Sequence, residues 1–169
     1  MIPGLLQTER YAKALMQAWL PQVDESVARD RANMRAERQQ TLYADNPVSV
    51  SAVVGEAALR QLVGGADTMI DQLEHLNAMS ELANVTVQVL PFSAGAVPAL
   101  GAPFILLSFA EKEEPDIAYA DYMTGCVYLE DASEVESYSL NFGALQDTAL
   151  SPAASTEFIE SIAGELRAR

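Results

Sequence analysis

Apolar side chains recur at helical spacing in five segments of the chain, and each recurrence predicts an amphipathic helix. Tyr11, Leu15 and Trp19 fall on one face of residues 8–20, and Pro21 ends that helix. The remaining segments cover residues 24–43, 67–82, 131–150 and 152–166, with Asp24, Asp67 and Ser151 as expected N-caps. Three of the expected core stripes are Met69, Leu73, Leu76 and Met79; Val135, Tyr138, Phe142, Leu145 and Ala149; and Phe158, Ile159, Ile162 and Leu166.

Shorter runs rich in β-branched and aromatic residues predict strands at 48–54, 85–90, 104–109, 117–122 and 126–130. A short helix at 56–62, closed by a Gly-Gly pair, and the helix at 67–82 separate the first two runs, so these strands are expected to be parallel. Short turns join the last three, which predicts an antiparallel meander. The pattern therefore indicates an α+β fold with a mixed sheet of about five strands and helices at both chain ends.

Length and composition fit one globular domain spanning residues 1–169. Hydrophobic residues make up 50% of the chain, enough for a packed core, and the single cysteine forms no intrachain disulfide. The N-terminus lacks the basic start and apolar run of a signal peptide. The most apolar stretch, 95–110, is broken by two prolines and is too short to span a bilayer. We therefore expect a cytoplasmic protein.

The charge is unevenly distributed along the chain. Residues 1–60 carry seven basic and seven acidic side chains, whereas residues 61–169 carry three basic and seventeen acidic ones, so the net charge of −14 belongs to the second part. Such a surface repels nucleic-acid phosphates and anionic lipid headgroups. These 169 residues are therefore expected to bind neither DNA nor a membrane by themselves.

Motifs of catalysis and cofactor binding are missing from the sequence. It contains no P-loop, GxGxxG, CxxC, HExxH or GxSxG pattern, and one histidine with one cysteine makes no typical zinc site. His75 is expected to be an ordinary, partly exposed histidine, and Cys126 a small packed residue. We therefore expect no enzyme activity, no cofactor and no metal.

Two arginines interrupt the apolar stripe of the predicted helix 24–43. Val27, Arg31, Met34, Arg38 and Leu42 share one face, and a buried guanidinium requires a paired anion or carbonyl. The stripe is interpreted as a structural ion-pair cluster, as long side chains that reach the surface, or as a ligand or partner pocket. Glu56 and Asp121 are the candidate carboxylate partners of these arginines, and the pocket would be bounded by Arg31, Arg38, Glu56, Tyr119 and Asp121.

The loop 92–103, which begins with Phe92, is rich in Gly, Ala and Pro. It is interpreted as a lid over that pocket, as a contact surface, or as a plain well-packed connection.

Several runs appear in an order typical of one family. They are IPGLLQTE at 2–9, GEAALR at 55–60, QLEHL at 72–76, VTVQVLPF at 85–92, FILL at 104–107 and ALSP at 149–152. In this order the chain resembles the C-terminal domain, itself of unknown function, of actinomycete XRE-type helix-turn-helix regulators in the WhiJ-like group, which are abundant in Streptomyces. The resemblance covers nearly all of residues 2–166.

The resemblance implies an N-terminal helix-turn-helix domain in the intact protein, which would bind operator DNA. It also implies a small partner protein encoded by a neighbouring gene, and it transfers no catalytic residue. We therefore expect a regulatory domain that mediates protein–protein interaction, as a homodimer, with the small partner, or both. The alternative is a small-molecule sensor with a pocket near Arg31, Arg38 and the loop 92–103.

Overall fold

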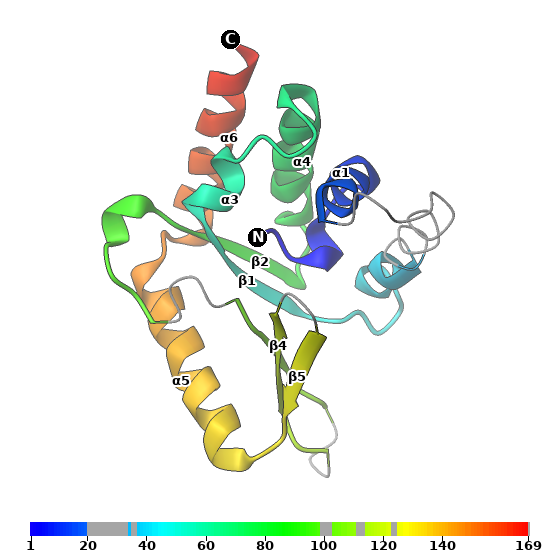
Figure 1. Ribbon diagram of the computed structural model, residues 1–169, viewed down its shortest axis with the longest axis vertical. Coiled ribbons are helices and arrows are strands. Elements are labelled where there is room, and N and C mark those ends of the chain that lie inside the picture. The colour runs from blue at the N-terminus through cyan, green and yellow to red at the C-terminus, as the bar shows by residue number, and fades with distance from the viewer. Residues whose placement is uncertain (20–33, 35–36, 99–102, 111–113, 123–124, 169) are drawn as a thin grey trace. The chain divides into compact units, whose positions relative to one another are not determined.

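The computed structural model describes residues 1–19, 34, 37–98, 103–110, 114–122 and 125–168. They divide into two compact units (Figure 1). The parallel-sheet unit comprises Met1–Phe92 and Leu150–Arg169, and the meander unit comprises Ser93–Ala149. Each unit is described by itself.

Two parallel strands form the sheet of the parallel-sheet unit. β1 (Val50–Gly55) pairs in register with β2 (Val85–Leu90), from Val50 opposite Val85 onward, which confirms the predicted crossover. The remaining elements are the 3-10 turns η1 (Gly4–Leu6), η2 (Gln40–Leu42) and η3 (Phe92–Ala94), whose last residues belong to the other unit, and the helices α1 (Glu9–Trp19), α3 (Glu56–Arg60), α4 (Ala66–Met79) and α6 (Pro152–Arg167).

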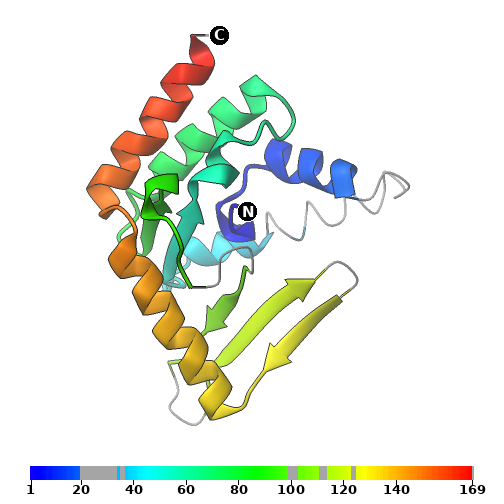
Figure 2. The same ribbon diagram turned by 60° about the vertical axis from the view of Figure 1, so that its left-hand side comes forward.

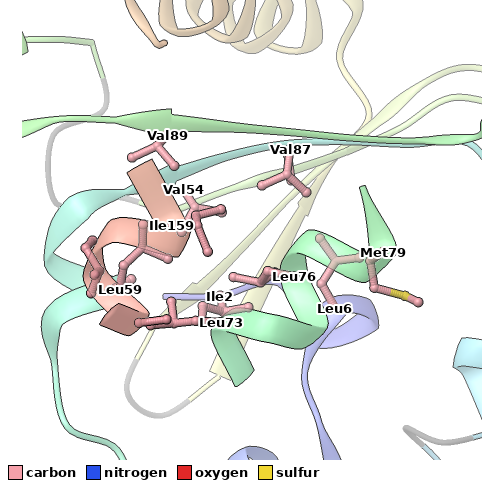
Figure 3. Close-up of a cluster of buried hydrophobic side chains, with 14 of the residues drawn as sticks. Ile2, Leu6, Val54, Leu59, Leu73, Leu76, Met79, Val87, Val89 and Ile159 are labelled. Atoms are coloured by element: carbon pink, nitrogen blue, oxygen red, sulfur yellow. The ribbon is translucent and has the colours of Figure 1, made fainter. Parts of the chain in front are cut away.

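The core of this unit lies between the sheet and helices α4 and α6, which run side by side (Figures 1 and 2). All four residues of the predicted α4 stripe are buried, as are Ile159, Ile162 and Leu166 of α6. Val85, Val87 and Val89 of β2 alternate toward the same core, and Ile2 and Leu6 complete it from the N-terminal segment (Figure 3). The apolar periodicity of the sequence therefore identified the buried faces of α4 and α6 correctly.

The starts of two helices test the predicted capping residues. The side chain of Ser151 accepts the Ala154 N–H at 3.3 Å, and α6 begins with Pro152, as predicted. The expected cap by Asp67 is wrong, because α4 begins at Ala66 with Gly65 at the N-cap and no side-chain cap. Gly65 has a φ of +91°, a backbone conformation that favours glycine. Asp67 instead lies in the first turn of α4, where the helix dipole favours a negative charge.

The meander unit contains a three-stranded antiparallel sheet and one helix. β3 (Ile105–Leu107), β4 (Ile117–Tyr122) and β5 (Gly125–Leu129) occur in that order, which confirms the predicted meander. Helix α5 (Ala132–Thr148) follows, capped by the carboxylate of Asp131, which accepts the backbone N–H groups of Ser133 and Glu134. Helix and strands are drawn together in Figure 2.

The α+β class is confirmed, but the five described strands form two sheets, of two and three strands, in place of one mixed sheet. The alternation of apolar and polar residues shows which face of a strand is buried. It does not show which other strand pairs with each edge. Most of the predicted helix 24–43 lies outside the described residues. Within them, Met34 and residues 37–39 are helical and continue into η2.

Candidate functional site

Glu56 is the one buried carboxylate among the described residues, at 8% exposure. It begins α3 directly after β1, and its Oε1 accepts the Nε–H of Arg60, one helical turn later, at 2.7 Å. Its Oε2 accepts the backbone N–H of Phe92 at 2.8 Å. Arg60 also donates from Nη1 to Glu165 of α6 at 2.9 Å, so Arg60 links α3 to α6 while Glu56 holds the chain at the end of β2.

Burial alone would raise the pKa of Glu56. The hydrogen bond from Phe92 and the adjacent Arg60 guanidinium outweigh it and hold this pKa below its usual range. The carboxylate is therefore charged and satisfied at neutral pH. It fixes the backbone of Phe92, whose ring is 64% exposed.

The expected pairing of Glu56 with Arg31 or Arg38 receives no support. Both Glu56 oxygens are taken by Arg60 and Phe92. Arg31 lies outside the described residues. Arg38 is exposed, which agrees with the interpretation that the long side chains reach the surface. Met34 is 61% exposed, so the expectation that this position faces the core is wrong. Leu42 is buried as expected. The partner of Glu56 that the sequence analysis missed is Arg60, and the i,i+4 spacing of opposite charges was the signal for it.

Tyr119 and Asp121 lie in the meander unit, on alternate positions of β4. The hydroxyl of Tyr119 donates to the carboxylate of Asp121. This bond, together with burial and the negative charge of Asp121, raises the pKa of Tyr119. The ring of Tyr119 also packs against that of Tyr128 across β4 and β5, with centroids 5.0 Å apart. The two carboxylates predicted for one pocket, Glu56 and Asp121, thus each have partners within their own unit.

Helix α5 covers one face of the meander. The ring of Phe104, which precedes β3, makes edge contacts with Tyr138 and Phe142 of α5, at centroid distances of 5.0 and 6.4 Å. Strand residues alternate between the faces, so Leu106 shares the face of Phe104, and Ala118, which pairs with Leu106, is fully buried. Together these residues identify the face under α5.

The opposite face of the meander, which we call the open face, is apolar and aromatic. Directly paired residues of antiparallel strands project to the same side, and the pairs Ile105–Tyr119, Leu107–Ile117 and Tyr119–Tyr128 define it. Ile105 is 49%, Leu107 41% and Tyr128 60% exposed. The open face consists of Ile105, Leu107, Ile117, Tyr119, Asp121, Cys126 and Tyr128.

Sequence reasoning identified Tyr119 and Asp121 but missed the exposed apolar residues beside them. The usable signal was the run FILL at 104–107, which places apolar side chains on both faces of one strand. In an antiparallel meander with a single helix, one of those faces lacks a helix to cover it.

The single cysteine and the single histidine differ in how they match expectation. Cys126 is a free, exposed thiol opposite Asp121, so its expected packing is wrong. It lies on the outer strand, where no described layer covers it.

His75 is half-buried on α4, as expected, and burial lowers its pKa. Its Nε2 has no hydrogen-bond partner among the described residues.

The described part of the chain has neither a cluster of metal-ligating side chains nor a membrane-spanning helix. No three His, Cys, Asp or Glu side chains there lie close enough together to hold a metal ion. No helix there combines the length and apolar character needed to cross a membrane.

Comparison with known proteins gives one match. A family model described as a domain of unknown function, DUF5753, matches residues 1–161. Neither a curated protein nor a solved structure matches significantly.

Proposed function

We propose that this chain, which belongs to that family of unknown function, is a protein-interaction domain whose contact surface is the open face of the meander. The observation that carries the proposal is the exposure of Ile105, Leu107 and Tyr128 side by side. A contiguous apolar and aromatic patch in water is typical of a surface that a partner covers.

The small size of the buried core in the meander unit supports the same proposal. Ala118 and Val135 are its only buried apolar side chains among the described residues. A sheet of three short strands with one helix gains little from so few buried groups. Covering the open face would bury further apolar area, at roughly 25 cal/mol per Å².

The biological setting proposed for this interaction is a transcriptional regulator. We propose that the domain follows an XRE-type helix-turn-helix domain in the intact, cytoplasmic protein and transmits partner binding to it. The ordered runs that resemble WhiJ-like regulators support this proposal. Regulation of this kind requires the partner to bind two states of the regulator unequally. The native residues preceding Ile2 test it, because a helix-turn-helix pattern is expected there.

Of the two expected partners, we favour the small protein encoded nearby over a second copy of this chain. The meander unit carries ten acidic residues and one basic residue, so two open faces would meet with like charge. Light scattering tests the homodimer: self-association that Tyr128→Ser abolishes would favour it over the small partner.

The contact surface itself is tested by co-purification of the full-length protein with the neighbouring small protein. The double change Ile105→Ser with Tyr128→Ser is expected to abolish capture, because it removes the two most exposed large hydrophobic side chains of the open face. Leu140→Ser is the matched control, since Leu140 is 70% exposed on α5 and not part of the open face. Equal capture by the double variant and the wild type would rule out the open face as the contact.

A further inference from the structure

The outer strand β5 has a free edge. It pairs with β4 alone among the described strands, so its other side presents backbone N–H and C=O groups without a strand partner. Four of its five residues are exposed, and it contains neither proline nor a charged residue. Proteins usually protect an edge strand with proline, with charged residues or with a segment that covers the edge. The edge of β5 therefore has the character of a strand-acceptor site.

The other outer strand, β3, is a poorer acceptor. It has three residues, against five in β5, and Pro103 stands just before it. A three-residue edge offers few outward backbone groups to an added strand. Strand addition to this sheet therefore favours β5.

The side chains beside β5 favour the binding of a positively charged group. Tyr128 projects from β5 onto the open face with its ring against Tyr119, and the Tyr119 hydroxyl holds the Asp121 carboxylate next to both rings. Glu130 and Asp131 follow at the end of the strand. Aromatic faces and carboxylates together form favourable surroundings for an ammonium or guanidinium group. The meander unit as a whole has a net charge of −9.

We propose that β5 accepts an extended, basic segment of a partner protein as an added strand, with alternate Lys or Arg side chains over Tyr128, Tyr119 and Asp121. Main-chain hydrogen bonds supply affinity in this mode of recognition, and alternate side chains supply specificity. The inference rests on the proposed interaction function and adds the chemistry of the partner. A second copy is disfavoured as the occupant, because it would bring another unit of the same negative charge.

Three synthetic peptides of about six residues, the usual strand length, test the proposal against the full chain. One alternates Lys with Leu, and one alternates Glu with Leu. The third repeats the Lys peptide with N-methyl groups on every backbone nitrogen, so that its charge is kept but neither edge can donate a backbone hydrogen bond. Fluorescence anisotropy at an ionic strength of about 0.15 M is expected to show binding of the first peptide alone.

Variants locate the site on the protein. Tyr128→Ser is expected to weaken binding of the Lys peptide about two- to fivefold, which corresponds to the loss of an exposed cation–π contact. Asp121→Asn is expected to weaken it as well, whereas Glu136→Gln on α5 removes the same charge from the same unit and is expected to leave binding unchanged. Circular dichroism confirms the fold of each variant, and the peptide comparison requires no variant at all.

Three results would overturn the proposal. Equal binding of the N-methylated peptide would mean charge attraction without strand addition. No preference for the Lys peptide over the Glu peptide up to about 1 mM, whether both bind equally or neither binds, would exclude a basic strand. Self-association that Tyr128→Ser abolishes would make a second copy the occupant. In the first two cases, capture of the small partner through Ile105 and Tyr128 would still stand, so failure of this inference is distinguishable from failure of the proposed function.

Discussion

The side-chain amide of Gln72 binds the backbone on both sides of Gln7. Its Oε1 accepts the Thr8 N–H at 2.7 Å, and its Nε2 donates to the Leu6 carbonyl, also at 2.7 Å. Gln72 is fully buried on α4, and it thereby fixes the N-terminal IPGLLQT segment against the core. A buried amide that satisfies two backbone groups across 64 and 66 residues makes the early segment part of the folded unit.

Gln72→Leu is expected to lower the free energy of unfolding by about 2–4 kcal/mol, because a buried backbone donor and a buried acceptor both lose their partner. Urea titration measures the change. Gln61→Leu serves as the control, since Gln61 is exposed, and a change within about 0.5 kcal/mol is expected there. A loss at Gln72 no larger than at Gln61 would contradict the bridging role.

Glu56 should make stability depend on pH in the acid range. Its pKa in the folded protein lies below the ordinary value of 4.5, so its contribution is fully present above that pH and is lost as pH falls through the folded pKa. Urea titrations from neutral to acid pH are expected to show this loss, and Glu56→Gln should flatten it. At neutral pH the substitution should cost about 1–3 kcal/mol.

Glu165→Gln is the control for Glu56, because it removes the exposed partner of the same Arg60. Its expected cost is about 0–1 kcal/mol, with little change in the acid pH profile. If both variants gave the same pH profile, the assignment of the acid dependence to Glu56 would be wrong.

Phe104→Ala should destabilise the meander unit, since the ring packs edge-on against Tyr138 and Phe142. The expected cost is about 2–3 kcal/mol, from lost burial and lost aromatic contacts. Hydrogen exchange of β4 amides measures it locally. Phe92→Ala is the control, because its ring is 64% exposed, and unchanged exchange is expected.

Gly64→Ala should cost more than Gly65→Ala. Both glycines have positive φ, +71° and +91°, so each substitution carries a conformational cost of about 1–2 kcal/mol. A β-carbon at Gly64 would also lie 2.8 Å from the β-carbon of Ala14 and 3.0 Å from Thr68, whereas the space at Gly65 is open. Overpacking therefore adds about 1–3 kcal/mol at Gly64 alone, and thermal unfolding of both variants measures the difference. Equal costs would mean that α1 moves aside freely.

The sequence by itself determined most of the described elements and the buried faces of α4 and α6. The stripe Met69, Leu73, Leu76 and Met79 is buried as its spacing predicts, and the parallel crossover and the meander both follow from element order. Hydrophobic periodicity and turn-forming residues are local properties, because they depend only on residues that are close in the chain.

The tertiary structure decided which residues meet. Glu56 binds Arg60 and Phe92 in place of the expected arginines, and the strands divide into two sheets. It also decided that Ile105, Leu107 and Tyr128 remain exposed, because α5 covers one face of the meander and leaves the open face without a described helix. Alternation shows that a strand has an apolar face, but what covers that face depends on elements distant in the chain, or on another protein.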